Sequence, residues 1–102
     1  MTLYITQYRS LARDASGNVI PAGEEPSIGT TVMAVGATAQ QSPPLDSSCR
    51  FIELHTDSVC HVEIGENPVA TTGKRRLPAG VITFQGLGNN PDRLRISVIQ
   101  GV

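Results

Sequence analysis

The chain has 102 residues and a formal net charge of −1, from 8 basic and 9 acidic residues. This length fits a single folding unit, so one domain is expected over residues 1–102. The balanced charge gives no overall field that would attract a phosphate backbone or an anionic membrane surface. We therefore expect neither direct nucleic-acid binding nor membrane association.

The N-terminal residues and the longest apolar run both argue against export or membrane insertion. Residues 1–10 have no basic start, and Thr2, Thr6 and Gln7 interrupt their apolar character. The longest apolar run, 32–37, is far shorter than the roughly 18 residues that span a bilayer. We expect a protein that is soluble and intracellular when it is made.

In chain order, the N-terminal half shows short strands separated by turn residues. A strand is predicted over 3–8, followed by a long loop over 10–25 that has room for one helical turn at 10–15. A second strand is predicted over 31–35. The connection 36–48 contains Pro43-Pro44 and leaves room for a short edge strand.

The C-terminal half continues the same pattern. A hairpin is predicted over 50–64, and later strands are predicted at 69–72, 75–77, 81–85 and 94–99. In the last strand the apolar side chains alternate with Arg93, Arg95 and Ser97. About seven short strands with frequent turns predict an all-β fold, an antiparallel β-sandwich or small jelly-roll-like barrel.

The predicted hairpin defines where the two cysteines point. If Ile52 and Leu54 face the core, their partners on the second strand are Cys60, Val62 and Ile64, across a three-residue turn at 56–58. Cys60 then points into the core, whereas Cys49 has the opposite parity and lies roughly 17 Å along the ladder. A disulfide joins α-carbons no more than about 7 Å apart, so two free thiols are predicted.

The same register groups four polar side chains on the opposite face of the hairpin: Glu53, His55, His61 and Glu63. Two histidines and two carboxylates are suitable zinc ligands if three or four converge on one ion. A solvated sheet face with cross-strand His–Glu pairs explains the same residues. They are weak metal candidates, and no cofactor is expected.

Sequence motifs for catalysis are incomplete. No serine lies in a Gly-x-Ser-x-Gly turn, and Cys60 and His61 are adjacent strand residues that project to opposite faces. Gly73-Lys74 resembles a phosphate-binding loop but is preceded by Pro68 where that loop has its first glycine. The chain is not predicted to be an enzyme.

The basic residues suggest a contact surface. The candidates are Lys74, Arg75 and Arg76, with Arg93 and Arg95 later in the chain. Arginine forms forked hydrogen bonds with carboxylates and is common at protein interfaces. Single-stranded nucleic acid usually stacks on aromatic side chains, which are few here. A partner protein's carboxylates, or simply solvated charge, therefore account for the basic residues.

Several segments together resemble a family of small virion proteins of tailed bacteriophages. They are 50–65 (Arg-Phe-Ile-Glu-Leu-His-Thr-Asp-Ser-Val-Cys-His-Val-Glu-Ile-Gly), 67–71 (Asn-Pro-Val-Ala-Thr), 76–80 (Arg-Leu-Pro-Ala-Gly) and 95–99 (Arg-Ile-Ser-Val-Ile). Members typically begin with a short Tyr-containing strand, as residues 3–8 do, and Phe84 matches an aromatic residue before a Gly-rich turn. Pro43-Pro44 departs from the family's usual central connection.

The resemblance implies a virion structural role. The genes of this family tend to lie beside the major capsid gene. A capsid decoration, or cement, protein that binds the major capsid protein is the expected function, with assembly in the cytoplasm of the host bacterium. Self-association as a trimer or dimer is a further implication.

The contact is expected at the Arg75-Arg76 loop or at the N-terminal segment, through Leu3, Tyr4 and Tyr8. Two alternatives stay open. One is a head–tail connector or tail accessory protein present in few copies, and the other is a small metal-binding or enzymatic β-domain.

Overall fold

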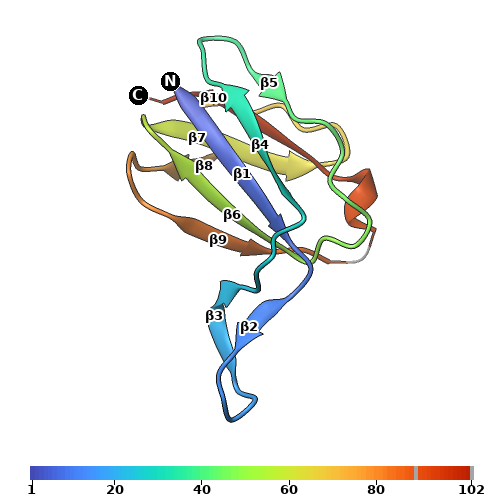
Figure 1. The fold of residues 1–102 in the computed structure, drawn as a ribbon. Helices are drawn as coiled ribbons and strands as arrows, with labels where there is room; N and C mark the ends of the chain where they lie inside the picture. Colours follow the sequence, from blue (N-terminus) through green and yellow to red (C-terminus); the bar gives the residue numbers. More distant parts are fainter. Residues whose placement is uncertain (89, 102) are drawn as a thin grey trace.

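The computed structural model describes residues 1–88 and 90–101, and these form a sandwich of two antiparallel sheets (Figure 1). The first sheet has the order β4 (Gly29–Ala34), β1 (Thr2–Tyr8), β6 (Phe51–Thr56) and β9 (Thr83–Gly86). The second has the order β5 (Gln40–Gln41), β10 (Arg95–Gln100), β7 (Cys60–Gly65) and β8 (Arg75–Leu77). A short 3-10 helix, η1 (Pro91–Arg93), leads into β10. The predicted all-β sandwich is confirmed.

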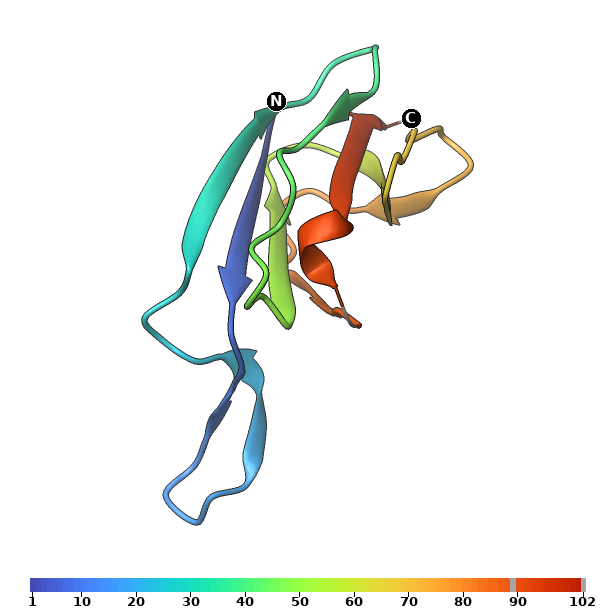
Figure 2. The same cartoon turned by 90° about the vertical axis from the view of Figure 1, so that its right-hand side faces the viewer.

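Alternation along the strands builds the core between the two layers, which Figure 2 shows from the side. Ile5 of β1 is opposite Leu54 of β6; Leu3 and Ile52 point to the same inner face, and all four are fully buried. The facing sheet contributes Cys60, Val62, Leu77, Ile96 and Val98 to the same cluster. Burying one such aliphatic side chain stabilises the fold by about 1.5–3 kcal/mol relative to leaving it exposed.

A two-stranded hairpin projects from the sandwich. It is formed by β2 (Leu11–Arg13) and β3 (Val19–Gly23), and we call it the arm (Figure 1). At its tip the Asp14 carboxylate accepts hydrogen bonds of 2.9 Å from the amides of Ser16 and Asn18. Gly17 has φ +84°, which favours glycine. The expected loop with a helical turn at 10–15 is therefore wrong, because this turn chemistry pairs two strands instead.

The predicted 50–64 hairpin is also wrong, although both of its strands exist. β6 lies in the first sheet and β7 in the second, so the 57–59 connection crosses between layers. The Asp57 carboxylate accepts a 2.7 Å hydrogen bond from the amide of Thr2, and the carbonyl of Thr56 accepts one of 2.9 Å from Gly80. Alternation shows which face is apolar but not which strand lies alongside. Here the two apolar sets are buried against each other across the sandwich.

The two cysteines are fully buried, and both thiols are free, as predicted. The reason why Cys49 is free differs from the predicted one. Cys49 precedes β6 and lies in a turn, where its amide donates to the carbonyl of Asp46 at 3.0 Å. Strand parity does not apply to a turn residue. The prediction that Cys49 points away from the core is wrong, and the prediction for Cys60 is confirmed.

Other strand boundaries follow the sequence more closely. The strands expected at 3–8, 31–35, 75–77, 81–85 and 94–99 correspond to β1, β4, β8, β9 and β10. A short edge strand, β5, lies in the 36–48 connection. Residues 69–72 form a loop and not a strand, so that prediction is wrong. Within residues 1–88 and 90–101, no helix is long and apolar enough to cross a membrane.

Candidate functional site

All four aromatic side chains of the protein lie on the outer face of the first sheet. Leu3 and Ile5 face the core, so Tyr4 and Tyr8 of β1 face outward; in β6, Phe51 likewise alternates with the buried Ile52. Phe84 of β9 is opposite Glu53, which also faces outward. We call Tyr4, Tyr8, Phe51, His55 and Phe84 the aromatic face.

The rings of the aromatic face contact one another across three strands. The centroids of Phe51 and Phe84 are 5.3 Å apart with an interplanar angle of 12°, which is a stacked pair. Those of Tyr8 and Phe51 are 6.2 Å apart, and Tyr4 and His55 form a third, separate pair at 6.0 Å. Aromatic pairs at these separations add about 0.5–1.5 kcal/mol beyond area burial. They also fix the ring positions without a partner.

Tyr8 is held in place by two carboxylates. Its hydroxyl is a hydrogen-bond donor to both carboxylates, at 3.1 Å from Glu25 and 3.3 Å from Glu53. Burial, followed by hydrogen bonding to Glu25 and the negative charges, raises the pKa of Tyr8 to about 12. The phenol is therefore neutral over the physiological pH range and keeps its proton for these carboxylates.

Part of the aromatic face is open to solvent. Tyr4 is 39% and Phe84 40% exposed, and the neighbouring Val32 and Ile82 are 61% and 51% exposed. Isolated exposed apolar residues are ordinary, but several on one rigid sheet face form a patch typical of protein interaction. Tyr and Phe are enriched at protein interfaces, so this surface is suited to bind another protein.

Sequence reasoning missed the aromatic face as a unit. The parity of each strand already puts Tyr4 and Tyr8 opposite Leu3 and Ile5, and Phe51 opposite Ile52. The missing information was that the strands at 2–8, 51–56 and 83–86 are neighbours in one sheet. With that order, the four aromatic residues of a chain without tryptophan lie together.

Of the three N-terminal contact candidates, only Tyr4 is available to a partner. Leu3 is fully buried and Tyr8 is 6% exposed, beneath Gly23 at the base of the arm. The prediction that Leu3 and Tyr8 contact a partner is wrong, because both side chains are used within the fold. Tyr4 is 39% exposed, so its contact with a partner stays a prediction.

Arg75 connects the two sheets. It is opposite the core-facing Val62, and Gln85 of β9 is opposite the core-facing Ile52, so both side chains extend into the space between the layers. The Arg75 guanidinium donates to the side-chain oxygen of Gln85. Beside this bridge lies a hollow of about 340 Å³, with Val62, Ile64, Leu87 and Leu94 as its apolar lining. Arg75 thus joins the edge strands β8 and β9 of the two sheets, although its side chain is also exposed to solvent.

The remaining basic candidates are dispersed. Lys74 forms an ion pair with Glu63 at 3.0 Å, and Arg76 is exposed on the outer side of the second sheet. Arg95 is half-buried and donates to the carbonyl of Ser42 at 3.4 Å, whereas Arg93 is exposed in η1. Arg75 and Arg95 lie on the two strands that flank β7. Arg75 is opposite Val62 on one side, and Arg95 is opposite Gly65 on the other. The structure therefore does not assemble these residues into one basic patch.

The four weak metal candidates are divided between the two sheets. Glu53 and His55 lie on the outer face of the first sheet, and His61 and Glu63 belong to β7 of the second. Among the described residues, no group of three or more His, Cys, Asp or Glu side chains is arranged to hold a metal ion. The grouping predicted from the hairpin is wrong because that hairpin does not form.

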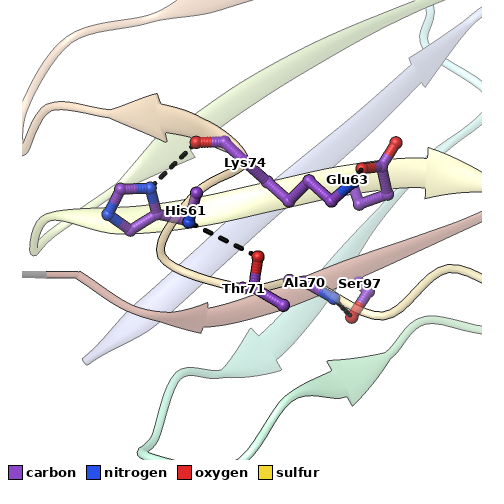
Figure 3. Close-up of polar contacts among 7 residues, drawn as sticks. His61, Glu63, Ala70, Thr71, Lys74 and Ser97 are labelled. Carbon is purple, nitrogen blue, oxygen red and sulfur yellow. Dashed lines mark hydrogen bonds and ion pairs between the residues drawn. The ribbon is translucent and has the colours of Figure 1, made fainter.

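His61 is buried beneath the 66–74 loop, which lies across the outer side of the second sheet (Figure 3). Its Nδ1–H donates to the carbonyl of Lys74 at 3.0 Å, and the amide of Ala70 donates to the hydroxyl of Ser97 at 2.9 Å. A bend closed by the hydrogen bond from Lys74 to Thr71 shapes the loop. His61 and Ser97 therefore anchor this loop.

Comparison with known proteins finds no protein-family model, curated protein or solved structure that matches this chain.

Proposed function

We propose that this chain is a structural protein of a tailed-bacteriophage virion, a capsid decoration protein that binds the major capsid protein through the aromatic face. The proposal joins the family resemblance of the sequence to one observation, that all four aromatic side chains lie on one face of a sheet. A decoration protein needs such a surface, because it must bind a protein shell and remain bound.

The physical properties of the face support this function. Its rings are positioned by ring–ring contacts, so little side-chain entropy is lost when a partner covers them. Tyr4 and Phe84 stay about two-fifths exposed and thus retain apolar surface to bury on binding.

The first experiment measures binding of the purified protein to heads of the virus whose genome encodes it. In the Tyr4→Asp/Phe84→Asp double variant, a charge on each side of the face should weaken binding about tenfold or more. The matched control is Val19→Asp/Val69→Asp, which changes two side chains of 51% and 60% exposure outside the face. Equal binding by the two double variants would contradict the assignment of this face.

The Arg75-Arg76 loop is the competing contact. Arg76→Glu tests it without disturbing the hydrogen bond from Arg75 to Gln85 that joins the sheets. We expect binding of Arg76→Glu to stay within about twofold of the unmodified protein, as is usual for a rim charge. Loss of binding in this variant alone would transfer the capsid contact to the basic loop.

A further inference from the structure

In residues 1–88 and 90–101 the sandwich has four edge strands, and three of them are protected against pairing with another chain. β5 contains only two residues, and β8 carries Arg75 and Arg76, whose charges oppose self-pairing. At β9, the side chain of Gln85 donates to the carbonyl of Gly86 at 3.2 Å and occupies an edge acceptor. Natural sheets commonly blunt their edges by such devices.

The fourth edge, β4, has none of these protections. Its six residues, Gly-Thr-Thr-Val-Met-Ala, include no charged residue and no proline, and its register with β1 is continuous from 29 to 34. In the described part of the chain its only strand neighbour is β1. Figure 2 shows β4 along the outer border of the first sheet. An uncharged, regular edge of this length is a template for another strand.

The pairing with β1 determines which backbone groups of β4 point outward. The amide of Val35 donates to the carbonyl of Met1 at 3.0 Å, so this residue pair is hydrogen-bonded. Antiparallel pairs alternate, and therefore Met33 and Thr31 also direct their backbone groups toward β1. The N–H and C=O groups of Thr30, Val32 and Ala34 point to the open edge.

We propose that β4 pairs antiparallel with β4 of a second copy of this chain, about a two-fold axis at Val32. This register places Val32 opposite Val32 and Thr30 opposite Ala34, so every outward backbone group has a partner. No charges meet, and Val32, 61% exposed, gains an apolar cross-strand neighbour. The two first sheets become one continuous sheet.

The second copy is the favoured occupant because the edge is self-complementary. A two-fold axis requires the same residues to fit each other in reverse order, and small uncharged side chains at 30 and 34 allow this. Side chains of paired strands share a face, so the two aromatic faces lie on the same side of the joined sheet. If the proposed function holds, the dimer presents two capsid-binding faces together and gains avidity.

The test uses the full chain and two charge variants with sedimentation velocity over a wide concentration range. We expect the unmodified protein to dimerise, and Thr30→Lys/Ala34→Lys and Thr30→Glu/Ala34→Glu each to be monomeric, because like charges then lie opposite one another. Mixing the Lys and Glu variants should restore a dimer by opposite-charge pairing. Val69→Lys, exposed to 60% on a loop, is the control and should dimerise normally.

Several results would overturn the proposal. They are a monomer up to millimolar concentration, a dimer that persists in both charge variants, and a mixture of the two variants that stays monomeric. Should the variants fail to fold, amide hydrogen exchange on the unmodified chain decides instead. Protection at Thr30, Val32 and Ala34 that increases with protein concentration supports the dimer, and protection independent of concentration contradicts it. Neither readout uses capsids, so failure of the dimer and failure of the proposed function are separate results.

Discussion

The ring of Tyr8 lies directly against the backbone of Gly23. A Cβ built on Gly23 would be 2.3 Å from Cγ of the tyrosine ring, closer than real side-chain contacts allow. Gly23 ends β3, so this contact joins the base of the arm to β1 of the sandwich. The absent side chain of Gly23 is what lets the arm leave the sheet over Tyr8.

Gly23→Ala should therefore destabilise the protein. The added methyl group has to displace the base of the Tyr8 ring, which is fixed by Phe51 and two carboxylates, and overpacking of this kind costs about 1–3 kcal/mol. Urea denaturation measures the free energy of unfolding. Gly65→Ala is the control: its Cβ meets nothing within 4 Å, and stability should be unchanged or higher by up to about 1 kcal/mol. Equal effects of the two substitutions would contradict the contact.

Stability should fall in strongly alkaline solution because of Tyr8. Its pKa is raised to about 12 in the folded protein from 10.0, chiefly by burial, so above pH 10 the unfolded chain loses this proton first. The stabilisation is complete below pH 10 and is lost as the pH rises through 12. Urea denaturation at several pH values should show this decline, and Tyr8→Phe should reduce it. The same slope in both proteins would contradict the assignment.

A direct titration isolates the same group. In a Tyr4→Phe variant, Tyr8 is the only remaining tyrosine, so the ultraviolet absorbance of phenolate reports Tyr8 alone. A midpoint near pH 12 is expected. A midpoint near 10, the ordinary value, would mean that the phenol is not enclosed by Glu25 and Glu53 as described.

The Ser97 hydroxyl should be needed to hold the 66–74 loop. Ser97→Ala leaves the amide of Ala70 buried without its 2.9 Å acceptor, which costs about 1–3 kcal/mol. Hydrogen exchange at the Ala70 amide should accelerate by the factor that corresponds to this loss of free energy. Ser47→Ala, at an exposed position, should change stability by no more than about 0.5 kcal/mol. An unchanged exchange rate at Ala70 in Ser97→Ala would exclude this anchoring role.

Both cysteine thiols should be unreactive until the protein unfolds. Burial raises the pKa of Cys49 and of Cys60, so little thiolate is present and reagent access is blocked. Alkylation followed by intact-mass measurement should give no adduct on the folded protein and two adducts in denaturant without reductant. Fewer than two adducts in denaturant would indicate a disulfide.

The sequence predicts where the strands lie better than it predicts which strands pair with each other. Alternation at 3–8, 75–77 and 94–99 is local information, and the strands appear there. Pairing is not local: the pattern of 50–64 fits a hairpin and a sheet-to-sheet crossover equally well. Two hydrogen bonds select the crossover: the amide of Thr2 donates to the carboxylate of Asp57, and the amide of Gly80 donates to the carbonyl of Thr56. Both donors belong to segments that are distant from 56–57 in sequence.

The same limit explains the candidate site. The register of the predicted hairpin groups Glu53, His55, His61 and Glu63 on one face as weak metal candidates, but the crossover separates them into two sheets. Tyr4, Phe51 and Phe84 are far apart in sequence, yet the strand order β1-β6-β9 unites them. Which residues face outward is readable from parity, whereas which outward residues meet depends on sheet order.

Quantitative mass spectrometry of purified virus particles tests the central claim most directly, by counting this protein against the major capsid protein. A decoration protein should be present at a simple stoichiometric ratio to the capsid subunit. A few copies per particle would indicate a connector or tail component and contradict capsid decoration, and complete absence from the particle would contradict a virion role altogether.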